Sequence, residues 1–85
     1  MPKERAEFER AKECANRALE MANMAIMLTP EHESAWSYKT NVLLELAKLA
    51  EMSGEVEPQR EFYRQYEEAL KETTRLSKRA AASNP

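Results

Sequence analysis

Apolar residues recur every three or four positions along most of this 85-residue chain, which is the spacing of one face of an α-helix. The first such seam advances in steps of 3, 4, 3, 4 and 3 through Phe8, Ala11, Ala15, Ala18, Ala22 and Ala25. A similar seam in the last third of the chain runs through Phe62, Tyr66, Ala69, Thr73, Leu76 and Ala80. Heptad-like seams of this kind pack helix against helix, and their small side chains let backbones approach closely.

Two proline-containing breaks divide the chain into three helices. Proline is tolerated in a first helical turn but not in a helix interior, so Thr29 is expected to cap a helix that begins around Pro30. Gly54 suits the left-handed residue that ends a helix, and Pro58 suits the start of the next helix. We therefore predict helices at about 3–28, 31–53 and 58–82.

Three helices joined by short turns pack as antiparallel neighbours. The predicted fold class is therefore all-α, a three-helix antiparallel bundle in which residues 1–85 form a single helical domain. A chain of this length has only a modest core.

The end of the first helix carries apolar residues in nearly all directions, and a helix that is apolar all round must be covered all round. Together with two aromatic residues of the second helix, these residues form a candidate surface for self-association or partner binding: Met21, Met24, Ile26, Met27, Leu28, Trp36 and Tyr38. Two interpretations stay open, because the same residues could instead be core of the chain itself. Methionine-rich surfaces adapt well to a partner.

Composition and charge exclude several classes of partner. Apolar residues make up 42% of the chain and charged residues 33%, values typical of a soluble helical protein. A net charge of −2 is too small to steer the chain to nucleic acid or to an acidic membrane. No apolar run is long enough to span a bilayer, and the charged N-terminus lacks the apolar stretch of a secretory signal. We expect a soluble, cytoplasmic-type protein with no nucleic-acid and no membrane partner, in a compartment that stays unknown.

The chain has little equipment for catalysis or metal binding, since it holds one Cys, one His and one Gly. Cys14 lies about 21 Å along the first helix from the turn that carries His32, too far for a catalytic pair. The Glu-x-x-His pattern of di-iron bundles would need Glu where Thr29 stands. Four glutamates near the second turn lack the calcium-loop pattern: Glu51, Glu55, Glu57 and Glu61. We expect no enzyme, with no catalytic residue, no cofactor and no metal.

Residues 18–43 resemble the junction between two tetratricopeptide repeats. In that family an alanine-rich helix leads to a proline, and a tryptophan opens the next helix of the 34-residue unit. Here Ala18, Ala25 and Leu28 lead to Pro30, and Ala35-Trp36 follows. Lys39-Thr40 stands where the family has Leu-Gly, and no further copy of the period follows. The resemblance implies helical hairpins that pack like repeats, with a concave peptide-binding face.

The leading functional hypothesis is a non-enzymatic helical scaffold, an engineered or de novo designed protein without biological activity that reuses natural helical fragments. Its expected partner is a second copy, in a homodimer formed through the apolar end of the first helix. The alternative is a natural protein–protein interaction module of the tetratricopeptide type that binds a peptide or partner helix. That alternative would present polar anchors along one strip, with Lys39, Asn41 and Arg64 as the candidates.

Overall fold

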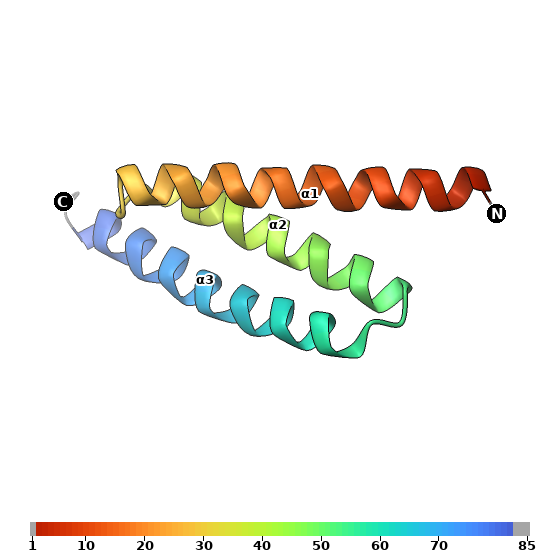
Figure 1. Ribbon diagram of the computed structural model, residues 1–85. Coiled ribbons are helices and arrows are strands. Elements are labelled where there is room, and N and C mark those ends of the chain that lie inside the picture. The colour runs from red at the N-terminus through yellow and green to blue at the C-terminus, as the bar shows by residue number, and fades with distance from the viewer. Residues whose placement is uncertain (1, 83–85) are drawn as a thin grey trace.

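The protein is a three-helix, all-α domain, as the computed structural model of residues 2–82 shows; side chains are described for residues 5–79. The helices are α1 (Pro2–Leu28), α2 (Glu33–Met52) and α3 (Val56–Ala82) (Figure 1). Consecutive helices run in opposite directions, and the described residues form no strand. The predicted fold class is therefore confirmed.

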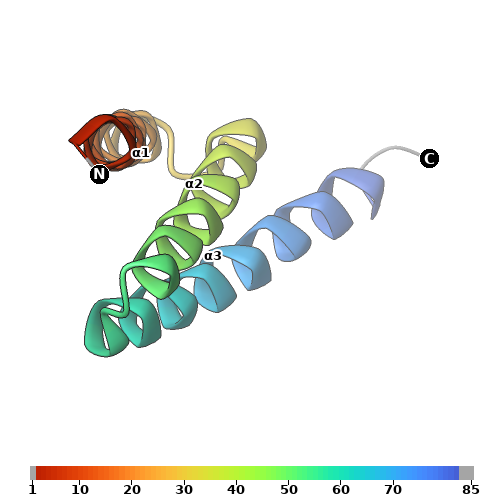
Figure 2. The same cartoon turned by 90° about the vertical axis from the view of Figure 1, so that its right-hand side faces the viewer.

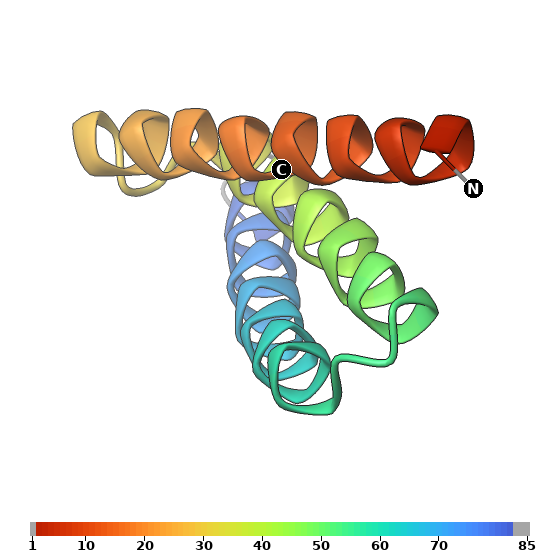
Figure 3. The ribbon, with the colours of Figure 1, turned by 45° about the vertical axis from the view of Figure 1, so that its right-hand side comes forward.

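The helix α2 occupies the middle of the fold. It packs against both α1 and α3, whereas α1 and α3 do not contact each other within the described part of the chain. Figures 2 and 3 show α1 crossing one side of the hairpin that α2 and α3 form. The fold is thus an open stack of helices, 55 × 21 × 19 Å in extent, and one long side of α1 faces away from both other helices.

Most of the core belongs to α2, because this helix is covered on two sides. Its buried residues are Ala35, Thr40, Val42, Leu43, Leu46, Ala47, Leu49 and Ala50. The outer helices add few buried residues, namely Ala15 and Ala22 from α1 and Ala69 and Leu76 from α3. These small contact residues come from the two predicted seams, although Ala11 is exposed and the side chain of Ala80 lies outside the described residues.

A hydrogen bond inside the contact between α2 and α3 joins two threonines that the sequence patterns did not pair. The hydroxyl oxygens of Thr40 and Thr73 are 3.1 Å apart. Because a hydroxyl carries one hydrogen, Thr40 accepts from Thr73 when it donates to the Trp36 carbonyl at 2.8 Å, and its buried hydroxyl is then fully satisfied. Because the two hydroxyls meet only when the helices are aligned, this pair helps to set the register of α2 against α3.

The first turn differs from its prediction, because His32 and not Thr29 is the N-cap of α2. Thr29 continues the last turn of α1, since its N–H donates to the Ala25 carbonyl at 2.9 Å. His32 then closes a turn by donating its N–H to the Thr29 carbonyl at 3.0 Å, and its ring Nδ1 accepts the N–H of Ala35 at 3.2 Å. The imidazole of His32 thus takes the N-capping role that was predicted for the Thr29 hydroxyl. Helix α2 begins at Glu33, two residues later than predicted.

The second turn is a Schellman motif around Gly54, which has a φ of +73°. The N–H of Gly54 donates to Glu51 and the N–H of Glu55 donates to Ala50, at 3.1 and 2.9 Å, so the last carbonyls of α2 are satisfied. This confirms the predicted role of Gly54. The predicted start of the third helix at Pro58 is wrong: α3 begins at Val56 and takes Pro58 into its first turn, where a missing N–H costs little.

Replacing Gly54 by alanine should lower the free energy of unfolding by about 1 kcal/mol, because an L-residue pays that amount in the left-handed region. A Cβ at this position would meet no atom within 4 Å, so the whole cost comes from the backbone. Gly54→Asn should cost less, since asparagine tolerates this conformation better. Urea unfolding of the three proteins measures the order. Equal stability of Gly54→Ala and the wild type would contradict the assignment.

Candidate association surface

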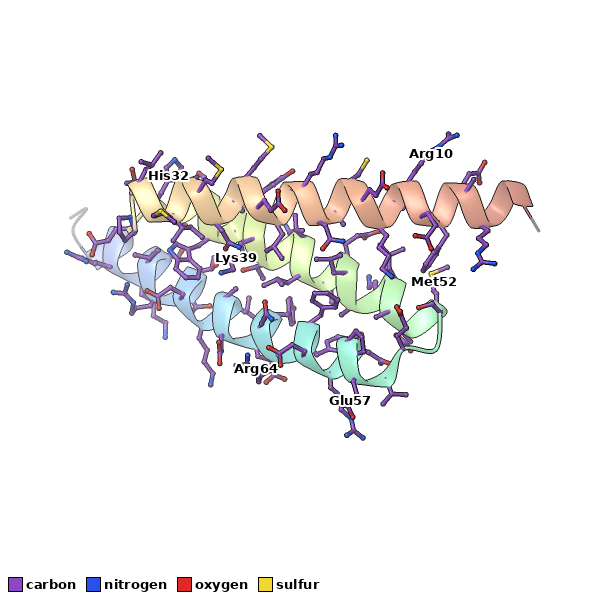
Figure 4. The ribbon with its side chains drawn as sticks, viewed as in Figure 1. Arg10, His32, Lys39, Met52, Glu57 and Arg64 are labelled. Carbon is purple, nitrogen blue, oxygen red and sulfur yellow. The ribbon has the colours of Figure 1, made fainter. Side chains whose placement is uncertain are left out.

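Four large apolar side chains at the C-terminal end of α1 lie exposed to water. Met21, Met24, Met27 and Leu28 keep 69, 62, 78 and 83% of their surface accessible. We call these four residues the α1 strip. They face away from α2 because the buried positions of α1, Ala15 and Ala22, lie on the opposite side of the helix. In Figure 4 most sulfur-bearing side chains of α1 point away from the other two helices.

The other members of the predicted surface lie elsewhere. Ile26 is half-buried on α1. Trp36 is also half-buried, and its indole N–H donates to the Pro30 carbonyl at 2.8 Å, which fixes the ring beside the first turn. Tyr38 is 52% exposed but belongs to α2. Of the predicted seven residues, the four of the α1 strip and Tyr38 are exposed, and Ile26 and Trp36 are half-buried.

Three residues of the α1 strip, Met21, Met24 and Leu28, belong to a second heptad-like seam that the sequence analysis missed. It runs through Cys14, Arg17, Met21, Met24 and Leu28 in steps of 3, 4, 3 and 4, and all five residues are exposed. The spacing was readable from the sequence, but the buried alanine seam on the other side of the same helix obscured it. A helix with two seams can contact neighbours on two sides, and this structure places a neighbour on one side only.

Charges are distributed unevenly along this second seam. Arg17 lies in its N-terminal half and Arg10 lies one helical turn before it; both are exposed, and Figure 4 shows Arg10 pointing away from α2. Beyond the apolar end, Glu31 lies in the first turn and pairs with Arg79 of α3. Glu9, Glu13 and Glu20 are exposed on α1 as well, so the α1 strip follows a stretch of mixed charge.

A second feature of interest is a cavity of about 230 Å³ between α2 and α3. Its lining residues are Trp36, Lys39, Gln65, Glu68, Ala69 and Glu72. The charged groups already have partners. The Lys39 ammonium lies 5.2 Å from the centre of the Trp36 ring, while Glu68 pairs with Arg64 and Glu72 with Arg75.

The three polar residues that were suggested as anchors of a concave peptide-binding face differ in the contacts that their side chains make. Lys39 lies over an indole, and Arg64 is bound on its own helix by Glu61 and Glu68, at 2.5 and 2.6 Å. Asn41 is exposed.

Two of the glutamates near the second turn, Glu55 and Glu61, accept side-chain hydrogen bonds and form ion pairs. The Ser53 hydroxyl and, next, the charge of Lys12 hold the pKa of Glu55 below its ordinary value. The Lys12–Glu55 pair, 3.5 Å long, ties α1 to the turn between α2 and α3. Hydrogen bonds from Arg64 and Gln65 lower the pKa of Glu61 from 4.5 to about 2.

The Glu61–Arg64 pair should make a small contribution to stability that depends on pH. Because folding lowers the pKa of Glu61, the contribution is present above pH 4.5 and is lost as the pH falls from 4.5 towards 2. Thermal unfolding of the wild type and Glu61→Gln across this range measures it, since other carboxylates titrate equally in both proteins. We expect the difference in Tm to shrink as the pH falls and to shrink at high salt, because the pair is exposed. A difference that grows at low pH would contradict this.

The residues singled out for chemistry are not brought together. Cys14 is exposed on α1 and His32 caps α2. Among the described residues, no three Cys, His, Asp or Glu side chains are placed to hold a metal ion. None of the helices described is long and apolar enough to cross a membrane. Comparison of the chain with models of protein families, with curated proteins and with solved structures found no match.

Proposed function

We propose that this chain is a non-enzymatic helical scaffold that self-associates through the α1 strip. One observation carries the proposal: among the described residues α1 packs on α2 and not on α3, and it leaves Met21, Met24, Met27 and Leu28 exposed to water. Contiguous exposed apolar side chains are uncommon on monomers and mark interaction sites.

The energetics favour covering the strip. Full burial of a methionine or leucine side chain contributes about 1.5–3 kcal/mol, and the four residues adjoin one another along two helical turns. Part of that gain is offset by lost translational and rotational freedom. A strip of this size therefore suits a reversible interface. Three methionines adapt to an opposing surface without a fixed shape.

Sedimentation equilibrium across a range of concentrations tests the proposal, together with Met24→Glu. We expect the wild type to shift from monomer to dimer as its concentration rises, and Met24→Glu to remain a folded monomer. Met52→Glu is the matched control, since Met52 is 76% exposed at the far end of α2 and should leave dimerisation intact. A wild type that stays monomeric throughout would refute the proposal, and so would unfolding of Met24→Glu.

The second candidate is a peptide-binding module of the tetratricopeptide type, and the cavity between α2 and α3 is the observation that favours it. Trp36 and Lys39, at the positions that carry the resemblance, line that cavity together with two carboxylates. An indole and carboxylates suit a cationic side chain. Trp36 is the single tryptophan of the chain, so its fluorescence reports on the cavity during titration with a short arginine-containing peptide. A saturable change that Ala69→Leu abolishes would support this candidate, and an unchanged emission would reject it.

An engineered origin is part of the first proposal. It is supported by two regular seams on α1 and α3 and by a repeat-like junction within a different helical context. The single exposed Cys14 and the five methionines fit the reuse of natural fragments better than idealised design from first principles.

A further inference from the structure

This inference rests on the second candidate function, the binding of a cationic side chain in the cavity between α2 and α3, and does not depend on self-association. We propose that Lys39 occupies the cation position over the Trp36 ring in the free protein, so that an incoming arginine side chain binds by displacing it. Three features support this arrangement: the fixed ring, the carboxylate oxygens that line the cavity, and the single contact that Lys39 makes.

The first support is the Trp36 ring, which is held in one position beside the cavity. The indole N–H donates to the Pro30 carbonyl at 2.8 Å, and the residue is half-buried. Lys39 follows Trp36 by three residues, so both side chains lie on one face of α2. A ring that is already ordered loses little conformational entropy when a cation stacks on it.

The second support is a pair of carboxylates on the α3 side of the cavity. Glu68 and Glu72 line it four residues apart and therefore share one face of α3. Arg64 donates to Oε1 of Glu68 at 2.6 Å, and Arg75 donates to Oε1 of Glu72 at 2.9 Å. Neither Oε2 atom accepts a hydrogen bond from the described residues. Because each carboxylate oxygen has lone pairs for a donor, both side chains can accept from a ligand as well.

These groups favour an arginine side chain as the ligand. A guanidinium is planar, stacks on an aromatic ring and presents five N–H donors in a fork that matches carboxylates. Gln65 also lines the cavity, and it donates its amide N–H to Glu61 at 3.0 Å, which leaves its carbonyl oxygen as a further acceptor. Several acceptors beside one indole ring suit the five donors of a guanidinium better than the three of an ammonium.

The third support is the contact that Lys39 itself makes. Its ammonium lies 5.2 Å from the centre of the Trp36 ring, within the range of a cation–π interaction. It forms no ion pair with any described residue, although two carboxylates line the same cavity. A single cation–π contact at a half-buried lysine is weak enough for a ligand to displace. While Lys39 lies over the ring the site is closed to a second cation, so the apparent affinity is reduced by the fraction of molecules in that state.

Substitution of Lys39 tests the inference, with Trp36 fluorescence as the readout and N-acetyl-arginine amide as the probe. Lys39→Met removes the ammonium and keeps an unbranched side chain, so the probe should bind at least about threefold more tightly than to the wild type. Lys39→Arg keeps a cation over the ring and should bind the probe as the wild type does. N-acetyl-citrulline amide has nearly the shape of the probe without its charge, and its binding should gain nothing from Lys39→Met.

Lys48→Met is the matched control, because Lys48 is exposed on the same helix and is not among the residues that line the cavity. It changes the net charge by the same amount, so it should leave the affinity for the probe nearly unchanged. Far-UV circular dichroism checks that each variant is folded.

The outcomes separate this inference from the candidate function. If the probe binds the wild type and Lys39→Met equally, or if Lys48→Met gives the same gain, the cavity stands as a binding site and displacement of Lys39 is wrong. Weaker binding to Lys39→Met would also overturn the inference, since Lys39 would then contribute to the site. If the probe binds neither protein, the candidate function fails together with the inference.

Discussion

Replacing Leu46 by alanine is expected to lower the free energy of unfolding by about 3 kcal/mol, the middle of the range for leucine truncation in a core. Leu46 is 2% exposed at the centre of α2. It belongs to a cluster that draws on all three helices: Ala15, Val42 and Leu49, with Phe8, Ala18, Leu19 and Phe62 packed against it. Because these neighbours are held by three separate helices, they cannot collapse into the vacated space without disturbing two helix contacts.

Urea unfolding followed by circular dichroism measures this loss, and Leu70→Ala is its control. Leu70 is the same residue type at 42% exposure on α3, so its truncation should change stability by less than about 0.5 kcal/mol. In a domain of this size the loss is a large part of the total stability, and part of the Leu46→Ala protein should be unfolded at physiological temperature. Equal effects of the two truncations would show that Leu46 is not at the centre of the core.

Ala22→Glu should destabilise the protein by on the order of 3 kcal/mol or more, because it places a carboxylate where no water reaches. Ala22 is 3% exposed in the contact between α1 and α2. Because α3 does not pack against α1 among the described residues, and the Lys12–Glu55 pair is partly exposed, a group that pushes α1 away from α2 meets little resistance from the rest of the fold. Displacement of α1 would also uncover the α2 residues that pack with its Ala15, among them Val42 and Leu46.

Thermal unfolding compares Ala22→Glu with Asn23→Glu, which adds the same charge one residue further along the same helix. Asn23 is exposed, so its replacement should leave Tm nearly unchanged. A similar Tm for the two variants would mean that α1 does not rest on α2 through this face.

The sequence predicted the helices well because their boundaries depend on local chemistry. Gly54 is the single glycine of the chain, and a left-handed helix end needs one. The start of α2 was mispredicted because Thr29 and Pro30 satisfy the usual capping pattern, whereas the structure caps the helix with a ring nitrogen of His32. An N-cap formed by an imidazole has no characteristic sequence pattern from which it could have been predicted.

The arrangement of the helices and the status of the α1 strip depend on longer-range packing. The apolar seam of α1 would have the same spacing if this helix packed against one neighbour or against two. The sequence therefore did not show that α1 and α3 do not pack against each other within the described residues. The spacing of Met24 was likewise compatible both with a core position and with an exposed position. Trp36 was grouped with the methionines by its apolar character, but its hydrogen bond to Pro30 draws it to the first turn.

The order in which the helices stack has a consequence for how the chain reaches its native state. Within residues 2–82, each helix packs against the helix that is next to it along the chain, and the two connections are short. No distant segments have to find each other before the core can form, so little loop-closure entropy opposes the search. Topologies dominated by such local pairing fold in microseconds to milliseconds.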